Sequence, residues 1–153
     1  MIDGICTTGA AEIAVACQIR LVGAAARISD WHLKNLGTGL GAWGAATRWA
    51  RLVGSARARE LFLTGREIGA EEAVRIGFAT AAHPSEQLFH EALAMARTIA
   101  AMDPRGVAVT LAHLSRTDDW TREVSLRFAR LAPRWFGVRG DIARKGAEIL
   151  GRD

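Results

Sequence analysis

The sequence has no tyrosine, only two cysteines and only four histidines among its 153 residues. Cys6 and Cys17 stand among apolar or small residues, so we expect two reduced thiols in the core of a cytoplasmic protein. The histidines are scattered and lack the close spacing that is typical of metal ligands. The sequence therefore predicts neither a disulfide-stabilised secreted domain nor a metal centre.

Long apolar runs are also missing. No stretch approaches the roughly twenty residues that a membrane-spanning helix needs. No basic segment followed by an apolar core opens the chain, as it would in a secretory signal. We therefore expect no membrane partner and no secretory signal.

Clusters of basic residues are absent as well, although the formal net charge is +4 and the pI is about 10.0. The basic side chains are spread along the predicted helices, and no aromatic stacking motif accompanies them. We therefore expect no nucleic-acid partner. A basic helical protein that binds nucleic acid is the least favoured of three functional hypotheses, and the other two are given below. A polyphosphate ligand would use part of this positive charge.

The length and the remaining composition are those of one globular domain. Half of the residues are hydrophobic and 24% are charged, which are ordinary values for such a domain. No internal repeat and no low-complexity segment is visible.

Chemistry is concentrated near the start of the chain. Gly4 and Gly9 bracket a turn of small residues, and an apolar run from 13 to 17 predicts a buried helix with Gly9 and Glu12 in its first turn. The first N–H groups of a helix have no partner inside it, so the Gly9 N–H could stabilise a developing negative charge on a carbonyl oxygen. Glu12, one turn away, could move a proton beside that carbonyl. From spacing alone, the favoured interpretation is a plain turn glycine and a glutamate that complements the helix dipole.

A set of motifs extends the pattern along the chain. Asp3-Gly4 followed by Thr8-Gly9-Ala10 and Glu12 resembles the Asn-Gly and Gly-Gly-Gly-x-Glu signature of the crotonase (enoyl-CoA hydratase/isomerase) family, with only the middle glycine kept. The resemblance is continuous to about His83-Pro84 and includes the segments Leu36-Gly37, 39–44, Arg48, 51–54, 59–65, 70–73 and Ile76-Gly77.

The resemblance implies an α/β fold. Residues 1–83 would form the C-terminal part of a crotonase-like ββα spiral core, and residues 84–153 a helical region of the kind that helps the family to form trimers. The strands that the family places earlier are absent, so the chain resembles an N-terminally truncated member. We expect a homo-oligomer, a trimer or a hexamer.

The resemblance also implies roles for single residues. Gly9 would be an oxyanion donor and Glu12 the first catalytic glutamate. The residues expected to contact the substrate are Thr8, Asp30, Trp31 and Trp43. A core role for the two tryptophans is equally compatible with the sequence.

The family's second catalytic glutamate is replaced. Ungapped counting from Glu12 places His32 at its position, whereas one extra residue before Gly37 would place Asp30 there. Histidine can act as a base near neutral pH, but a lone histidine beside a tryptophan is more often structural. The family's hydratases hold water with two carboxylates, so the loss of one puts hydration in doubt. A double-bond shift needs only one base.

The sequence thus predicts an enoyl-CoA hydratase/isomerase-like protein that acts on an acyl-CoA thioester. Coenzyme A would be part of the substrate, with no separate cofactor. The alternative is a catalytically inactive remnant of the family that serves as an oligomerisation or binding module.

Periodicity and turn residues also predict the elements. Strands are expected at 1–2, 19–22, 26–29 and 78–81, and helices after Gly9 and at 45–52, 55–64 and 70–76. The remainder of the chain predicts helices at 85–103, at 107–114, from Asp118 or Asp119 onward, and at 142–150 after Asp141. Ser55 and Ser85 are expected to cap the helices that follow them, and Pro133 to separate the last two helices.

Overall fold

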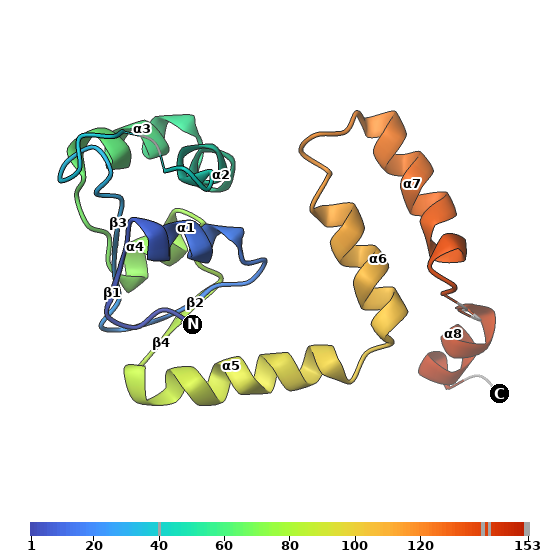
Figure 1. Ribbon diagram of the computed structural model, residues 1–153. Helices are drawn as coiled ribbons and strands as arrows, with labels where there is room; N and C mark the ends of the chain where they lie inside the picture. Colours follow the sequence, from blue (N-terminus) through green and yellow to red (C-terminus); the bar gives the residue numbers. More distant parts are fainter. Residues whose placement is uncertain (40, 139, 141, 152–153) are drawn as a thin grey trace. The chain divides into compact units, whose positions relative to one another are not determined.

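The computed structural model describes residues 1–39, 41–138, 140 and 142–151 and is mixed in class, as the sequence predicts (Figure 1). The chain divides into two compact units, Met1–Met95 and Ala96–Asp153. The elements as far as α5, in which the second unit begins, are β1 (Ile5–Thr7), α1 (Gly9–Ala16), β2 (Leu21–Gly23), β3 (Arg27–Ser29), α2 (Ala45–Val53), α3 (Ser55–Thr64), α4 (Ala70–Arg75), β4 (Ala81–His83) and α5 (Ser85–Ala100). Those that follow are α6 (Pro104–Leu114), α7 (Arg122–Trp135) and α8 (Ile142–Leu150).

The strands of the first unit form two parallel pairs. β1 pairs with β3, with Cys6 opposite Ile28, and β2 pairs with β4, with Val22 opposite Ala82. An isolated bridge from Ile2 to Val22 runs beside the second pair. Because parallel strands need a connection that crosses over between them, α1 lies between β1 and its partner in the chain, as Figure 1 shows.

Two of the predicted strands, 19–22 and 26–29, coincide within two residues with β2 and β3, whereas the first and the last are displaced. The stretch after Gly4 was expected to be a turn, yet Ile5–Thr7 is β1, and the expected strand at 1–2 contributes only the bridge at Ile2. β4 begins at Ala81, three residues later than predicted, because Phe78 and Ala79 are buried in the core ahead of it. Strands of three residues are too short to show the two-residue alternation that identifies a strand.

Trp49 on α2 is the centre of the core of this unit. It is 1% exposed and packs on Phe62 of α3 and on Phe78, with ring centroids 6.1 and 4.5 Å away. Ile28 on β3 and Ile68 are also buried, and their backbones are joined by two hydrogen bonds. The core therefore fixes α2 and α3 against the strand pair that carries the start of α1.

Helix ends follow the glycines. α2 and α3 have nearly the predicted bounds, and α3 ends at Gly65, which has a left-handed φ of 60°. Ser55 is the first residue of α3 rather than its cap, since Gly54 holds the cap position. Ser85 likewise begins α5, and its hydroxyl donates to the Asp3 carboxylate.

Two expectations for the second unit are wrong. α7 begins at Arg122, with Thr121 as its cap, rather than at Asp118 or Asp119. Pro133 lies inside α7 and does not separate it from α8. The predicted role of Asp141 lies outside the described residues.

The two cysteines differ in environment. Cys6 is buried, and its burial raises the pKa of its thiol. Cys17 is exposed at the end of α1, so the expectation of a core thiol is wrong for it. The apolar run from 13 to 17 is only partly buried, because α1 buries Ala14 and Val15 while Ile13 remains 62% exposed.

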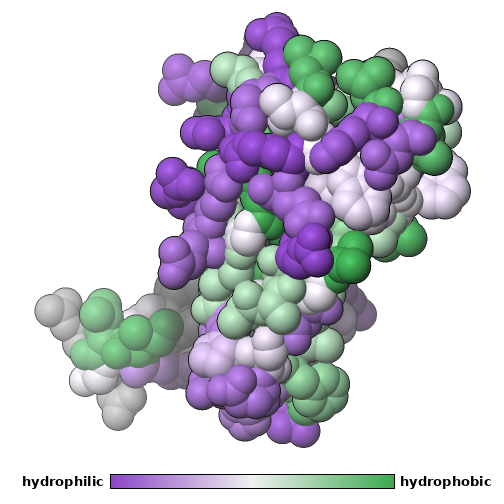
Figure 2. Space-filling model, turned by 90° about the vertical axis from the view of Figure 1, so that its left-hand side faces the viewer, coloured by the Kyte–Doolittle hydropathy of each residue, from purple (hydrophilic) through white to green (hydrophobic). Residues whose placement is uncertain are grey.

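Hydrophobic side chains reach the surface in several places on the face shown in Figure 2. In the second unit, the aromatic rings of His113, Trp120, Phe128 and Trp135 form a contiguous cluster between α6 and α7. None of the helices among the described residues is both long and apolar enough to cross a membrane.

Candidate active site

The start of α1 presents backbone N–H groups that have no acceptor within the helix. The chain turns from β1 into α1 at Thr8, whose φ of 54° and ψ of −117° are strained for a residue with a side chain. The Glu12 N–H bonds to the Thr8 carbonyl, and the N–H groups of the first three helical residues have no acceptor within the helix. Gly9 is the first of these residues, so a backbone N–H stands where the sequence predicts an oxyanion donor.

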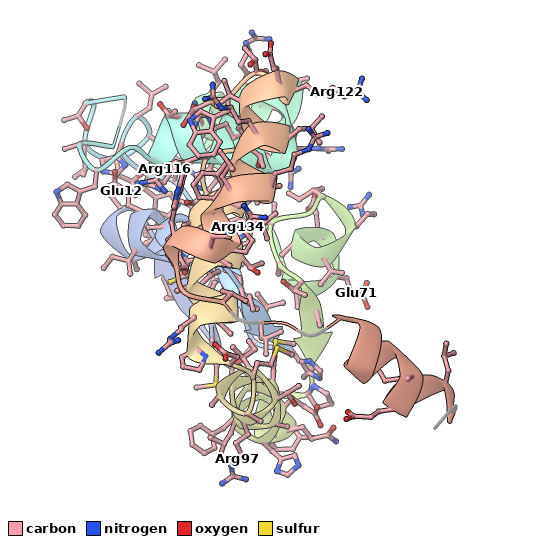
Figure 3. The ribbon with its side chains drawn as sticks, turned by 90° about the vertical axis from the view of Figure 1, so that its right-hand side faces the viewer. Glu12, Glu71, Arg97, Arg116, Arg122 and Arg134 are labelled. Carbon is pink, nitrogen blue, oxygen red and sulfur yellow. The ribbon has the colours of Figure 1, made fainter. Side chains whose placement is uncertain are left out.

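Glu12 is held by the loop that precedes α2. Its carboxylate is buried, and Oε1 accepts hydrogen bonds from the N–H groups of Trp43, at 2.8 Å, and Ala45, at 3.3 Å. Figure 3 shows Glu12 between α1 and this loop. A Cβ added at Gly41 would lie 2.2 Å from Oε1, so the loop can close over the carboxylate only with glycine there.

Asp30 and His32 form a buried pair beside Glu12. Asp30 directly follows β3 and is 2% exposed. Its Oδ1 accepts the backbone N–H of His32 at 3.0 Å, and its Oδ2 lies 2.9 Å from Nδ1 of the ring. The second ring nitrogen, Nε2, lies 3.7 Å from Glu12 Oε2. The structure thus brings together Glu12 and both residues that the sequence offers in place of the second glutamate.

The tryptophans occupy different places. The Trp43 ring is 66% exposed, and its Cζ3 lies 3.4 Å from where a Cβ of Gly9 would be. Its backbone, rather than its ring, contacts Glu12. Trp31 is half-buried and begins a turn in which its carbonyl accepts the Asn35 N–H. The Thr8 hydroxyl lies 3.2 Å from that of Thr7.

Sequence reasoning missed the residues that fix Glu12. Gly41 lies in the segment 39–44, which entered the sequence analysis only as part of the family resemblance, and Ala45 directly follows it. Trp43 and Ala45 follow Glu12 in the chain by 31 and 33 positions. Local sequence patterns do not predict contacts over such separations. A run of glycines after a candidate acid was the only available signal.

An apolar cavity of about 350 Å³ lies between α2 and α3, close to the same loop. Its lining comprises Leu33, Gly39, Ala46, Ala50, Ser55, Ala58, Arg59, Phe62 and Leu63. A second cavity, of about 330 Å³, lies against β1 and the exposed face of α1. No group of three or more metal-ligating side chains occurs among the described residues.

Comparison with known proteins shows which family the chain is similar to. Residues 1–130 match the model of the enoyl-CoA hydratase/isomerase family. The protein named "Probable enoyl-CoA hydratase, mitochondrial" from Dictyostelium discoideum is 33% identical over 129 residues, which are 84% of this chain and 46% of that protein. The chain thus spans about half the length of the curated relatives that it matches.

Solved structures share the fold. A crystal structure of an enoyl-CoA hydratase subunit from Geobacillus kaustophilus superposes with a TM-score of 0.88 at 23% identity, covering 99% of this chain and 58% of that one. A Thermobifida fusca protein named as an enoyl-CoA hydratase, in complex with acetoacetyl-CoA, has a TM-score of 0.79 at 24% identity over 84% of this chain and 50% of that one. On these matches, the chain belongs to the enoyl-CoA hydratase/isomerase family, which is the crotonase family that its motifs resemble.

Proposed function

We propose that this protein acts on acyl-CoA thioesters by stabilising a thioester enolate, with the Gly9 N–H as oxyanion donor and Glu12 as acid and base. The observation that carries the proposal is the setting of Glu12. One carboxylate oxygen is held by two backbone N–H groups, and the side chain is buried one helical turn from the Gly9 N–H, which has no acceptor within the helix. A proton-transfer group fixed beside an oxyanion donor is what enolate chemistry requires.

In this proposal Glu12 removes the proton from the carbon next to the thioester carbonyl. The electron pair of that C–H bond moves onto the carbonyl oxygen, where the Gly9 N–H stabilises the charge. Glu12 then returns the proton to the same carbon or to another carbon of the conjugated system. No metal and no redox cofactor takes part, and coenzyme A is carried as part of the substrate.

The T. fusca relative supports the substrate class, because that protein holds acetoacetyl-CoA. The apolar cavity of about 350 Å³ supports it further, since it is large enough for a short acyl chain. The reaction subtypes that we propose are those of the family, hydration (a lyase reaction) and double-bond isomerisation.

Assembly and location complete the proposal. Ile5 and Ile13 are 65% and 62% exposed and line or adjoin the second cavity, which is an apolar surface that association would cover. We therefore propose a homo-oligomer, a trimer or a hexamer, in the cytoplasm.

One observation favours a second candidate, an inactive family remnant that serves as an oligomerisation or binding module. The family's second catalytic glutamate is replaced in this chain, and Asp30 and His32 stand beside Glu12 instead. A site that has lost this carboxylate could still bind a ligand or a second copy of the chain without turning a substrate over.

Exchange of the protons next to the thioester of butyryl-CoA in D₂O separates the two candidates. Mass spectrometry detects this exchange even when overall turnover is slow. We expect exchange above the buffer rate, reduced by roughly two to four decades in Glu12→Gln. Glu71→Gln is the matched control, because Glu71 also lies in the first turn of a helix but is exposed. Exchange at the buffer rate in the unaltered protein would favour the remnant, and exchange that Glu12→Gln does not slow would refute the assignment of Glu12.

A further inference from the structure

The reaction proposed above leaves the buried pair Asp30 and His32 without a role. Asp30 Oδ1 accepts the backbone N–H of His32, and Oδ2 lies 2.9 Å from Nδ1 of its ring. Because an ionised carboxylate only accepts hydrogen bonds, a hydrogen bond between Nδ1 and Asp30 Oδ2 requires the hydrogen on Nδ1. In the neutral ring, Nε2 then presents a lone pair, and the nearest carboxylate to it is Glu12 at 3.7 Å.

Two acceptors therefore face each other beside the proposed oxyanion donor. The distance of 3.7 Å between Nε2 and Glu12 Oε2 exceeds a hydrogen bond, and neither atom supplies a hydrogen when the carboxylate is ionised. A water molecule has two O–H groups and can donate one to each acceptor from about 2.8 Å. A carbon-bound hydrogen satisfies neither acceptor in this way.

We propose that His32, oriented by Asp30, takes the place of the family's second catalytic glutamate, so that Glu12 Oε2 and His32 Nε2 together hold the water that adds to an enoyl-CoA. The inference rests on the proposed function and specifies its reaction. Hydration then remains open to this chain although the second glutamate is absent.

The step balances without a further reactant. One O–H bond of the water breaks, its proton passes to Glu12 Oε2, and the water oxygen forms a bond to C3 of the enoyl group. The π pair between C2 and C3 moves toward the thioester carbonyl, giving the enolate at the Gly9 N–H. Glu12 then gives its proton to C2. The second O–H bond stays intact and donates to His32 Nε2 throughout, so one water adds and no charge is left over.

Asp30 is a positioning residue in this scheme, and its replacement by asparagine has a definite consequence. The backbone N–H of His32 needs an acceptor, so the amide oxygen of the asparagine would face it and the NH₂ group would face Nδ1. Nδ1 would then have to accept, which moves the ring hydrogen to Nε2. A ring that donates at Nε2 can bond to Glu12 directly and no longer accepts from water.

The tautomer is measured directly by long-range ¹⁵N–¹H NMR of the histidine rings in the 153-residue chain. This readout needs no turnover. We expect His32, assigned by its loss in His32→Gln, to carry its hydrogen on Nδ1 in the unaltered protein and on Nε2 in Asp30→Asn. Asp118→Asn, a change at an exposed aspartate, is the matched control and should alter nothing. A hydrogen on Nε2 of His32 in the unaltered protein, alone or together with one on Nδ1, would overturn the inference.

A comparison of two reactions tests the role of the pair in turnover. A double-bond shift in a 3-enoyl-CoA moves a proton between carbons and needs only Glu12, whereas hydration of crotonyl-CoA needs water held in place. We expect His32→Ala to slow hydration about 100-fold while isomerisation changes less than about threefold. His90→Ala, at an exposed histidine, is the control.

The outcomes separate this inference from the proposed function. Glu12→Gln should slow both reactions, and a Glu12→Gln protein that keeps both would refute the proposed function itself. Equal effects of His32→Ala on hydration and isomerisation would refute only the role of His32. If the protein shows no measurable turnover, the NMR measurement of the His32 tautomer alone decides whether the inference holds.

Discussion

Gly41 gives the sharpest test of how Glu12 is held. A Cβ at this position would meet Glu12 Oε1 at 2.2 Å, Cδ at 2.6 Å and the Ala45 Cβ at 2.7 Å, distances that packed atoms do not adopt. Gly41→Ala must therefore displace either the loop or the carboxylate. Displacement breaks the hydrogen bonds that Oε1 accepts from Trp43 and Ala45.

The cost follows from the groups involved. Overpacking a buried site costs about 1–3 kcal/mol, and a hydrogen bond to a charged group contributes about 1.5–3 kcal/mol. Partial relaxation of the loop keeps the sum near the lower values, so we expect Gly41→Ala to lower the free energy of unfolding by about 2–4 kcal/mol. For a protein of this size that corresponds to a fall in Tm of roughly 5–15 °C.

Urea denaturation, followed by circular dichroism, measures the change. Gly146→Ala is the matched control, because a Cβ there meets nothing within 4 Å and the residue lies inside α8. That control should be neutral or stabilising by up to about 1 kcal/mol. A Gly41→Ala protein with unaltered stability and unaltered proton exchange would refute the account of the loop and of Glu12.

Three further predictions follow from single sites. Thr8→Gly should raise the free energy of unfolding by about 0.5–1 kcal/mol, because relief of the strained φ exceeds the entropy cost of glycine. A Thr8→Gly protein that unfolds at a lower urea concentration would contradict the conclusion that Thr8 is strained. Arg66 donates hydrogen bonds to both Glu60 and Glu72 and lowers the pKa of each carboxyl. These ion pairs therefore stabilise the fold fully above the ordinary carboxyl pKa of 4.5, and their contribution is lost as the pH falls through the lowered pKa. The difference in Tm between the unaltered protein and Glu72→Gln should therefore be larger at pH 7 than at pH 3, and a difference that grows on acidification would contradict it. Iodoacetamide should modify exposed Cys17 well before Cys6, whose thiol is buried with a raised pKa, and peptide mass spectrometry showing the reverse order would contradict the burial.

Local signals predicted the helices best. Gly54 and Gly65 punctuate α2 and α3, so their bounds could be read to within a residue. The three-residue strands carry little periodicity, and their positions depend on pairing with partners more than twenty residues away. Pro133 was misread as a break because the sequence cannot show that α7 tolerates it.

The site was predictable only in part. Glu12 could be placed in the first turn of a helix after Gly9, and it lies there. Whether Asp30 or His32 stands beside it could not be decided from counting, because the structure uses both, joined by hydrogen bonds two residues apart. The contacts from the loop to Glu12 are long-range, and folding alone brings them together.

The proposal that Gly9 and Glu12 act together on an acyl-CoA is tested most directly by a crystal structure of the protein with acetoacetyl-CoA bound. We predict that the thioester oxygen will lie about 3 Å from the Gly9 nitrogen, within hydrogen-bond distance. The carbon between the two carbonyl groups should face Glu12 Oε2. Acetoacetyl-CoA bound with its thioester away from the start of α1, or with Glu12 turned from the ligand, would contradict the account.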